Sequence, residues 1–138
     1  MMNAEVAEVR KGPVELNRIS AGIIQAAMKV HTALGPGLLE SAYETCLAYE
    51  LRKTGFHVTT QVPLAVTYED AVLDIGYRLD MLVEDEVIIE LKAIESIQPV
   101  HKAQLLSYLR LRKSRLGLLI NFHVEHLRDG ISRIVNRL

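Results

Sequence analysis

The feature that most constrains this chain is a short apolar segment with two charges near its centre. Residues 87–93 read Val-Ile-Ile-Glu-Leu-Lys-Ala and are apolar except for Glu90 and Lys92. Such a run predicts a buried strand over residues 87–94, where charges rarely stand without a partner or a metal ion. Side chains alternate between the faces of a strand, so Glu90 and Lys92 point to the same face. The alternative is a surface ion pair on a half-exposed strand.

A second acid, Asp80, is predicted to lie directly opposite Glu90. Residues 72–83 predict the preceding strand, and residues 84–86, Glu-Asp-Glu, predict a tight turn. In a hairpin centred near Asp85, residues equidistant from the centre face one another across the ladder. Opposed carboxylates repel unless a cation lies between them, and Mg²⁺ prefers oxygen ligands. The pattern therefore predicts a metal site with a lysine ammonium beside it.

The rest of the chain predicts an α/β or α+β fold in which helices flank a mixed β-sheet. Gly35-Pro36-Gly37 ends a segment of helical apolar spacing, and after Gly55 the spacing changes to that of strands, with Pro63 favouring a sheet edge. The predicted elements are helices over about 15–34 and 38–53, extended chain over 56–68, strands over 72–83 and 87–94, a helix over 99–113, and strands over 116–122 and 131–135.

Length and composition predict one compact domain. The chain has 138 residues, of which 49% are hydrophobic, and this suits a single packed core. Residues 1–13 are predicted to be frayed or disordered, and residues 14–138 to form the domain. No window is apolar enough to span a bilayer, and the lone Cys46 cannot form an internal disulfide. We therefore expect a cytoplasmic protein with no membrane partner.

Charge is distributed unevenly along the chain, although the net charge is only −1. Residues 71–100 carry a net charge of −5, and residues 101–138 carry +6. An acidic centre beside a basic tail fits a cation site flanked by a phosphate-attracting surface. Ordinary solvated charge is the alternative. The bases that end the helix predicted over 99–113 equally suit the negative end of its dipole.

These residues carry a resemblance to a known family. Asp80, followed after nine residues by Glu90-Leu91-Lys92, resembles the signature of the PD-(D/E)XK nuclease superfamily. Residues 37–43, Gly-Leu-Leu-Glu-Ser-Ala-Tyr, resemble the motif of the GxxExxY protein family within it, and the likeness extends over roughly residues 15–136. It implies a restriction-endonuclease-like core. One departure is Leu79, which stands where the superfamily often has proline.

The resemblance implies roles for residues beyond Asp80, Glu90 and Lys92. Glu40 would be a metal ligand, direct or through water, although an acid in the first turn of a helix is favoured by the dipole anyway. The Leu91 carbonyl would join the metal ligands. Gln104 and Tyr108 resemble a QxxxY element and, at i and i+4, share one helical face.

Other residues have weaker signals. Arg78 shares strand parity with Asp80 and would contact phosphate or neutralise the acids, and His101 is a candidate for the rim of the site. Tyr43 and Tyr108 are candidates for substrate contact, and the alternative is half-buried packing with tethered hydroxyls. His31 is better explained by helix packing than by metal binding.

The function implied is that of a nuclease using Mg²⁺ (or Mn²⁺) to hydrolyse the phosphodiester bonds of nucleic acid, and DNA is favoured over RNA as its partner. Asp80, Glu90, Lys92, Gln104 and Glu40 would form its catalytic set. The alternatives are a non-catalytic nucleic-acid-binding or regulatory module on the same fold, and a protein-interaction scaffold. A homodimer would extend the reach of so short a chain.

Overall fold

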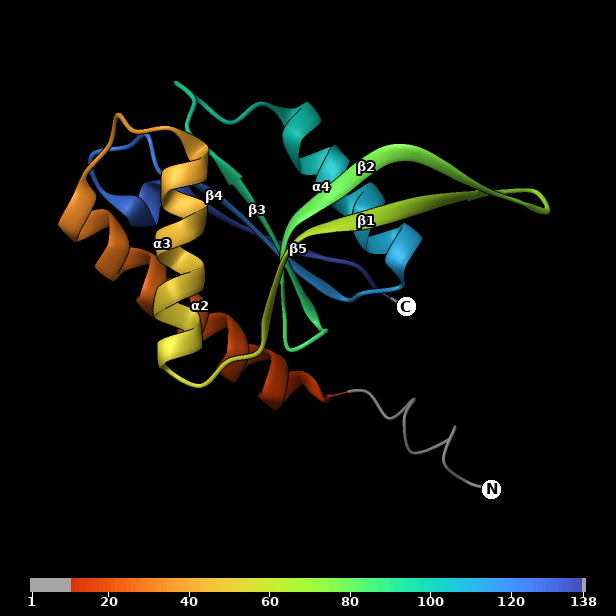
Figure 1. Cartoon of the computed structure of the whole chain (residues 1–138), viewed down its shortest axis with the longest axis horizontal. Helices are drawn as coiled ribbons and strands as arrows, with labels where there is room; N and C mark the ends of the chain where they lie inside the picture. Colours follow the sequence, from red (N-terminus) through yellow and green to blue (C-terminus); the bar gives the residue numbers. More distant parts are fainter. Residues whose placement is uncertain (1–10, 138) are drawn as a thin grey trace.

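A computed structural model of the chain describes residues 11–137, which form one mixed sheet with helices on both faces (Figure 1). The sheet has five strands in the order β1-β2-β3-β4-β5. The pairs β1/β2, β2/β3 and β4/β5 are antiparallel, and β3/β4 is parallel. The elements are α2 (Pro13–Leu34), α3 (Glu40–Lys53), β1 (Val58–Tyr68), β2 (Ala71–Val83), β3 (Val87–Lys92), α4 (Pro99–Arg112), β4 (Leu116–Asn121), η1 (Leu127–Gly130) and β5 (Ile131–Val135).

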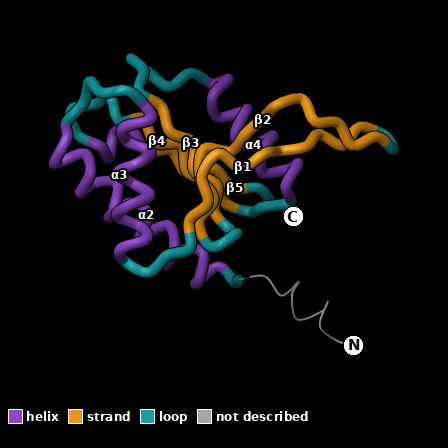
Figure 2. Tube along the Cα trace, in the orientation of Figure 1, coloured by secondary structure: helices purple, strands orange, loops and turns teal. Residues whose placement is uncertain are grey.

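Each face of the sheet has its own apolar layer. Alternate residues of β3, such as Ile89 and Leu91, pack with the buried faces of α2 and α3. Ile88 points to the opposite face of the sheet, where it packs with the buried face of α4. Helix α4 is the crossover that joins β3 to β4, as a parallel pair requires. Figure 2 shows the strands as a twisted central band between these helices.

The predicted elements and their order are confirmed, with small differences at the ends. Pro13 was predicted to end the frayed N-terminal segment, but in the structure it is the first residue of helix α2. Proline suits the first helical position, because its missing N–H is not needed there. Residues 1–10 of that segment lie outside the described residues. Strand β1 is an edge strand that contains Pro63, as predicted. Within residues 11–137, no helix combines the length and the hydropathy that crossing a bilayer requires.

The turn between α2 and α3 is held by the side chain of Tyr43. The Tyr43 hydroxyl donates to the Gly35 carbonyl at 2.5 Å and accepts from the Leu38 N–H at 3.1 Å. Its ring is fully buried and stacks on Phe122, with centroids 4.4 Å apart. Gly35 has φ +69° and Gly37 has φ +105°, so both occupy backbone conformations that favour glycine. One tyrosine thus positions the turn that precedes Glu40.

Tyr43→Phe is expected to lower the free energy of unfolding by about 1 kcal/mol, because it removes the two hydrogen bonds through which the Tyr43 hydroxyl joins the Gly35 carbonyl and the Leu38 N–H. Urea unfolding followed by circular dichroism measures this. Tyr49→Phe is the matched control on α3, since Tyr49 is 63% exposed, and it should change stability little. Equal effects of the two substitutions would contradict the role given to the Tyr43 hydroxyl.

Candidate active site

Asp80 and Glu90 lie where the β2/β3 ladder ends. Its last regular pair on this side is Met81 with Ile89. Beyond it, the Asp80 N–H donates to Glu90 Oε2 at 2.9 Å, and the Leu91 N–H donates to Asp80 Oδ2 at 2.8 Å. Each carboxyl therefore accepts a hydrogen bond from the backbone of the opposite strand. The hairpin register predicted from the turn is confirmed, and it brings the two acids together.

Strand β1 is also irregular opposite Asp80. Thr60 pairs with Met81 and Val62 pairs with Leu79, but Gln61 between them makes no regular pair with Asp80. Gln61 has φ +52°, a left-handed conformation that is uncommon for residues other than glycine. Burial raises the pKa of Asp80, and the Gln61 side chain is among the groups that oppose this rise. Neither β1 nor β3 thus forms a regular ladder pair with Asp80.

The environment of the two carboxyls favours their neutral forms. Glu90 is only 7% exposed, and burial, followed by the charge of Asp80, raises its pKa from 4.5 to about 8. Burial also raises the pKa of Asp80, although the Leu91 N–H and the charge of Lys92 oppose the rise. Two adjacent acids that are costly to ionise gain most from a nearby cation.

Lys92 supplies positive charge without a direct ion pair. It is half-buried at the end of β3, and its charge lowers the pKa of both Asp80 and Glu90. Among the ion pairs within 4.0 Å that residues 11–137 form, none includes Lys92. The ammonium group is therefore close enough to act through its charge and is not held in a salt bridge.

Helix α3 adds two acids near the pair. Glu40 is exposed in the first turn of α3, and its charge contributes to the raised pKa of Glu90. Glu44, one turn further on, is half-buried and accepts a hydrogen bond from the Gln61 amide at 2.8 Å. Burial, with the charges of Asp80 and Glu40, raises the pKa of Glu44.

Glu44 and Gln61 were not predicted from the sequence. The i, i+4 spacing from Glu40 is a signal for Glu44, because it places both acids on one face of α3. The sequence does not indicate that Gln61 lies opposite Asp80, because that position depends on a register shift between Leu64 and Val66.

Helix α4 brings Tyr108 near the acids and leaves Gln104 exposed. Tyr108 is 7% exposed, and its ring centroid lies 5.9 Å from that of Tyr77. Burial raises the pKa of Tyr108, and the charges of Glu90, Tyr77 and Asp80 add to the rise. Tyr108 thus faces the acidic pair, and Gln104 lies one turn earlier on the same helix.

The other predicted site residues lie in different settings. Arg78 is exposed and donates to the Gln61 carbonyl at 3.4 Å, at the edge of the acidic pair. His101 caps α4, with its Nδ1 accepting from the Gln98 N–H at 2.8 Å. Tyr43 is fully buried with its hydroxyl engaged. This corrects the expectation of a substrate contact at Tyr43 in favour of the packing alternative.

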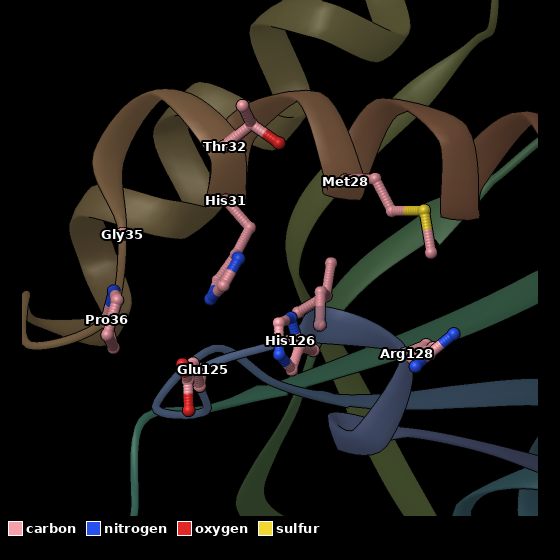
Figure 3. A pocket seen from close by; sticks show the side chains of 9 residues that line it. Met28, His31, Thr32, Gly35, Pro36, Glu125, His126 and Arg128 are labelled. Carbon is pink, nitrogen blue, oxygen red and sulfur yellow. The ribbon is translucent and has the colours of Figure 1, made fainter.

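His31 lies away from the acidic pair, in agreement with the packing role predicted for it. It is 8% exposed, and its Nε2 lies 2.8 Å from the Val124 carbonyl. It lines a cavity of about 550 Å³ between the end of α2 and the segment around η1, together with Met28, Thr32, Gly35, Pro36, Glu125, His126, Leu127 and Arg128 (Figure 3). None of the residues predicted for the acidic site lines this cavity.

Comparison with known proteins identifies the family. A sequence model described as the PD-(D/E)XK nuclease superfamily matches residues 17–134. The chain belongs to this superfamily. A search of curated proteins gives no match. The crystal structure of SSO0001 is similar in fold, with a TM-score of 0.54 and 18% sequence identity over 99% of this chain and 74% of that one.

The five-stranded mixed sheet flanked by helices is thus the restriction-endonuclease-like fold of the PD-(D/E)XK superfamily, as predicted. Asp80, Glu90 and Lys92, whose spacing in the sequence resembles the superfamily signature, lie at or next to the open end of the β2/β3 ladder. Within residues 11–137, no group of three or more His, Cys, Asp or Glu side chains is close enough to hold a metal ion. The two carboxyls that accept hydrogen bonds from the backbone of the opposite strand are those of Asp80 and Glu90.

The raised pKa of Glu90 predicts a pH-dependent stability for the metal-free protein. Its pKa is 4.5 when unfolded and about 8 when folded, so its contribution to stability is full below 4.5 and is lost as pH rises through about 8. Wild-type protein with a chelator should therefore lose up to a few kcal/mol of unfolding free energy between about pH 5 and pH 9.

Glu90→Gln removes this titration, so the free energy of unfolding of the variant, measured with urea, should change less with pH over the same range. Glu95→Gln, at an exposed position after β3, is the matched control and should retain the wild-type slope. The same slope for wild type and Glu90→Gln would contradict the environment assigned to Glu90.

Proposed function

We propose that this PD-(D/E)XK protein is a metal-dependent nuclease that hydrolyses phosphodiester bonds. The observation that carries the proposal is the pairing of Asp80 and Glu90 at the end of one ladder, with Lys92 on the same strand as Glu90. A buried and a half-buried carboxyl, both with a raised pKa, and a nearby ammonium suit the binding of a cation and the handling of a phosphate anion.

The donor set fits a hard divalent ion such as Mg²⁺ or Mn²⁺. Asp80 and Glu90 each use one oxygen to accept a backbone N–H, and within residues 11–137 the Oε1 of Glu90 accepts no hydrogen bond. These carboxyls would hold the ion with the Leu91 carbonyl, and Glu40 would act directly or through water. Such an ion supplies Lewis-acid polarisation of the phosphate and a more acidic bound water.

The remaining residues would position the reactants. Lys92 would hold the attacking water by hydrogen bonding and stabilise the negative charge that develops on the phosphate. Gln104 would steady Lys92 or a phosphate oxygen, and Tyr108 would donate its hydroxyl to the substrate backbone. Arg78, exposed beside Gln61, would attract a phosphate, and His101 would lie at the rim.

We propose that the substrate is nucleic acid and favour DNA over RNA as that substrate. The proposed location of the protein is the cytoplasm. Membership of the narrower GxxExxY family, suggested by Gly37, Glu40 and Tyr43, is part of the same proposal. Glu44 is added to the acids that would surround the ion, because its pKa responds to both Asp80 and Glu40.

Asp80→Asn and Lys92→Ala should each lower cleavage by a factor on the order of 100 or more, since one removes a metal ligand and the other the charge beside it. Purified protein is incubated with fluorescently labelled single- and double-stranded DNA and RNA, with Mg²⁺, with Mn²⁺ or with chelator. Gel electrophoresis then measures the initial rate of cleavage.

Two matched controls separate the site from general charge effects. Asp74→Asn changes an exposed acid on the same strand as Asp80, and Lys29→Ala changes an exposed lysine on α2. Both should retain wild-type rates. Cleavage that survives Asp80→Asn and Lys92→Ala would refute the assignment. Binding of nucleic acid without cleavage under any metal would favour the non-catalytic module, and binding of neither metal nor nucleic acid would favour the scaffold.

Gln104→Ala should reduce cleavage by about tenfold, less than Lys92→Ala, because Gln104 acts by positioning. The measurement is the initial rate against substrate concentration with saturating Mg²⁺. Gln25→Ala, an exposed glutamine on α2, serves as the control. Rates identical to wild type at every substrate concentration would remove Gln104 from the site.

A further inference from the structure

The outer part of the β1–β2 hairpin projects beyond the helices that cover the rest of the sheet (Figures 1 and 2). We call residues 65–77 the arm. The arm exposes five large apolar side chains: Tyr68 (66% exposed), Val72 (71%), Leu73 (41%), Ile75 (58%) and Tyr77 (43%). A two-stranded ribbon is marginally stable in water on its own, and a contiguous exposed apolar surface marks an interaction site.

One face of the arm continues the apolar layer that α4 covers. Leu64 belongs to the buried cluster beneath α4 and pairs with Tyr77, whose ring contacts Tyr108 of α4. Further out, Val66 pairs with Leu73 and Tyr68 pairs with Ala71. Because side chains two residues apart share a face, Val66, Tyr68 and Leu73 extend this layer. Helix α4 thus covers this face of the sheet near Leu64, whereas the same face is exposed to solvent along the arm.

Charge indicates what would cover the arm. The arm carries Glu69, Asp70 and Asp74 and no lysine or arginine, a net charge of −3. Phosphate groups would be repelled by this surface, so nucleic acid is disfavoured as its partner. A complementary surface is basic and has small or apolar side chains at its centre.

The outer face of α4 has this character. Helix α4 contains no acid, and its exposed Lys102 and Arg110 form no ion pair with any acid in residues 11–137. The residues exposed beside Arg110 include Val100, Ala103, Ser107 and Leu111, whose spacing places them on one side of the helix, and Lys102 lies at the edge of the exposed part of the helix. Val100 is 66% exposed and Leu111 is 37% exposed.

We propose that two copies of this chain form a two-fold dimer in which the arm of each copy packs on α4 of the other. The apolar face of the arm and α4 lie on the same face of the sheet, so one two-fold axis beside α4 satisfies both contacts at once. The acidic end of each arm then meets Lys102 and Arg110 of the other copy. The test of this surface measures mass, so its outcome does not depend on whether the protein cleaves nucleic acid.

Wild-type protein should sediment as a dimer in analytical ultracentrifugation at about 100 µM, and the double variant Tyr68→Ser, Leu73→Ser should weaken dimerisation by at least about tenfold. Val72→Ser is the matched control, because Val72 pairs with Thr67 and so lies on the other face of the arm. It should leave the dimer unchanged. A monomeric wild type, or a dimer unaffected by the double variant, would overturn the proposal.

Charge reversal tests which surface the arm contacts. Glu69→Lys with Asp70→Lys reverses the arm, and Lys102→Glu with Arg110→Glu reverses α4. Each reversed protein alone should be monomeric, because its arm and helix then carry like charge. An equimolar mixture of the two should form a heterodimer, since each arm again meets a helix of opposite charge.

Circular dichroism of each reversed protein confirms folding, and the mixture keeps the test decisive if one of them dimerises weakly. Failure of the mixture to form a heterodimer, with both proteins folded, would overturn the arm-to-helix contact. So would a heterodimer formed by the arm-reversed protein with wild type in preference to the helix-reversed protein, because that result indicates arm-to-arm pairing. Arm substitutions that weaken DNA binding in a monomeric protein would assign the arm to nucleic acid instead.

Discussion

The site depends on an exchange of hydrogen bonds at the end of the β2/β3 ladder. The Asp80 N–H donates to the carboxyl of Glu90, and the Leu91 N–H donates to the carboxyl of Asp80. A regular ladder would bond these strands through carbonyls and leave the side chains above and below the sheet. Here each acid is fixed by the strand opposite, so the carboxyls are positioned by the backbone of a packed core rather than by mobile side-chain contacts.

This arrangement determines the electrostatics of the site. Burying two acids side by side raises the pKa of both, and Lys92 offsets part of that cost through its charge. The neighbouring elements add acid rather than base, since Glu40 and Glu44 approach from α3. The charge of Lys92 therefore offsets only part of the negative charge that these acids carry when ionised. The remaining negative charge is the physical basis for proposing a metal ion. The Tyr43 hydroxyl contributes to the site indirectly, because its hydrogen bonds hold the turn that precedes Glu40.

The sequence predicted the parts of the fold and site that depend on local pattern. The register of Asp80 with Glu90 follows from a short hairpin that can be counted from its turn, and the apolar run around Glu90 predicted the buried strand. Gln61 could not be predicted in this way, because counting back from the turn at Glu69-Asp70 fails at the irregularity between Leu64 and Val66. Tyr43 shows a different limit. Its motif position does not reveal that its hydroxyl bonds to the preceding turn, since that depends on tertiary packing against Phe122.

The most direct test of the central claim is the location of a bound ion. Crystals soaked in Mn²⁺ give anomalous difference density that identifies the ion without reference to activity. The account predicts a peak within coordination distance, about 2.0–2.4 Å, of a carboxyl oxygen of Asp80 and one of Glu90. A peak bound only by other residues, or carboxyls of Asp80 and Glu90 too far apart to share one ion at saturating Mn²⁺, would contradict it.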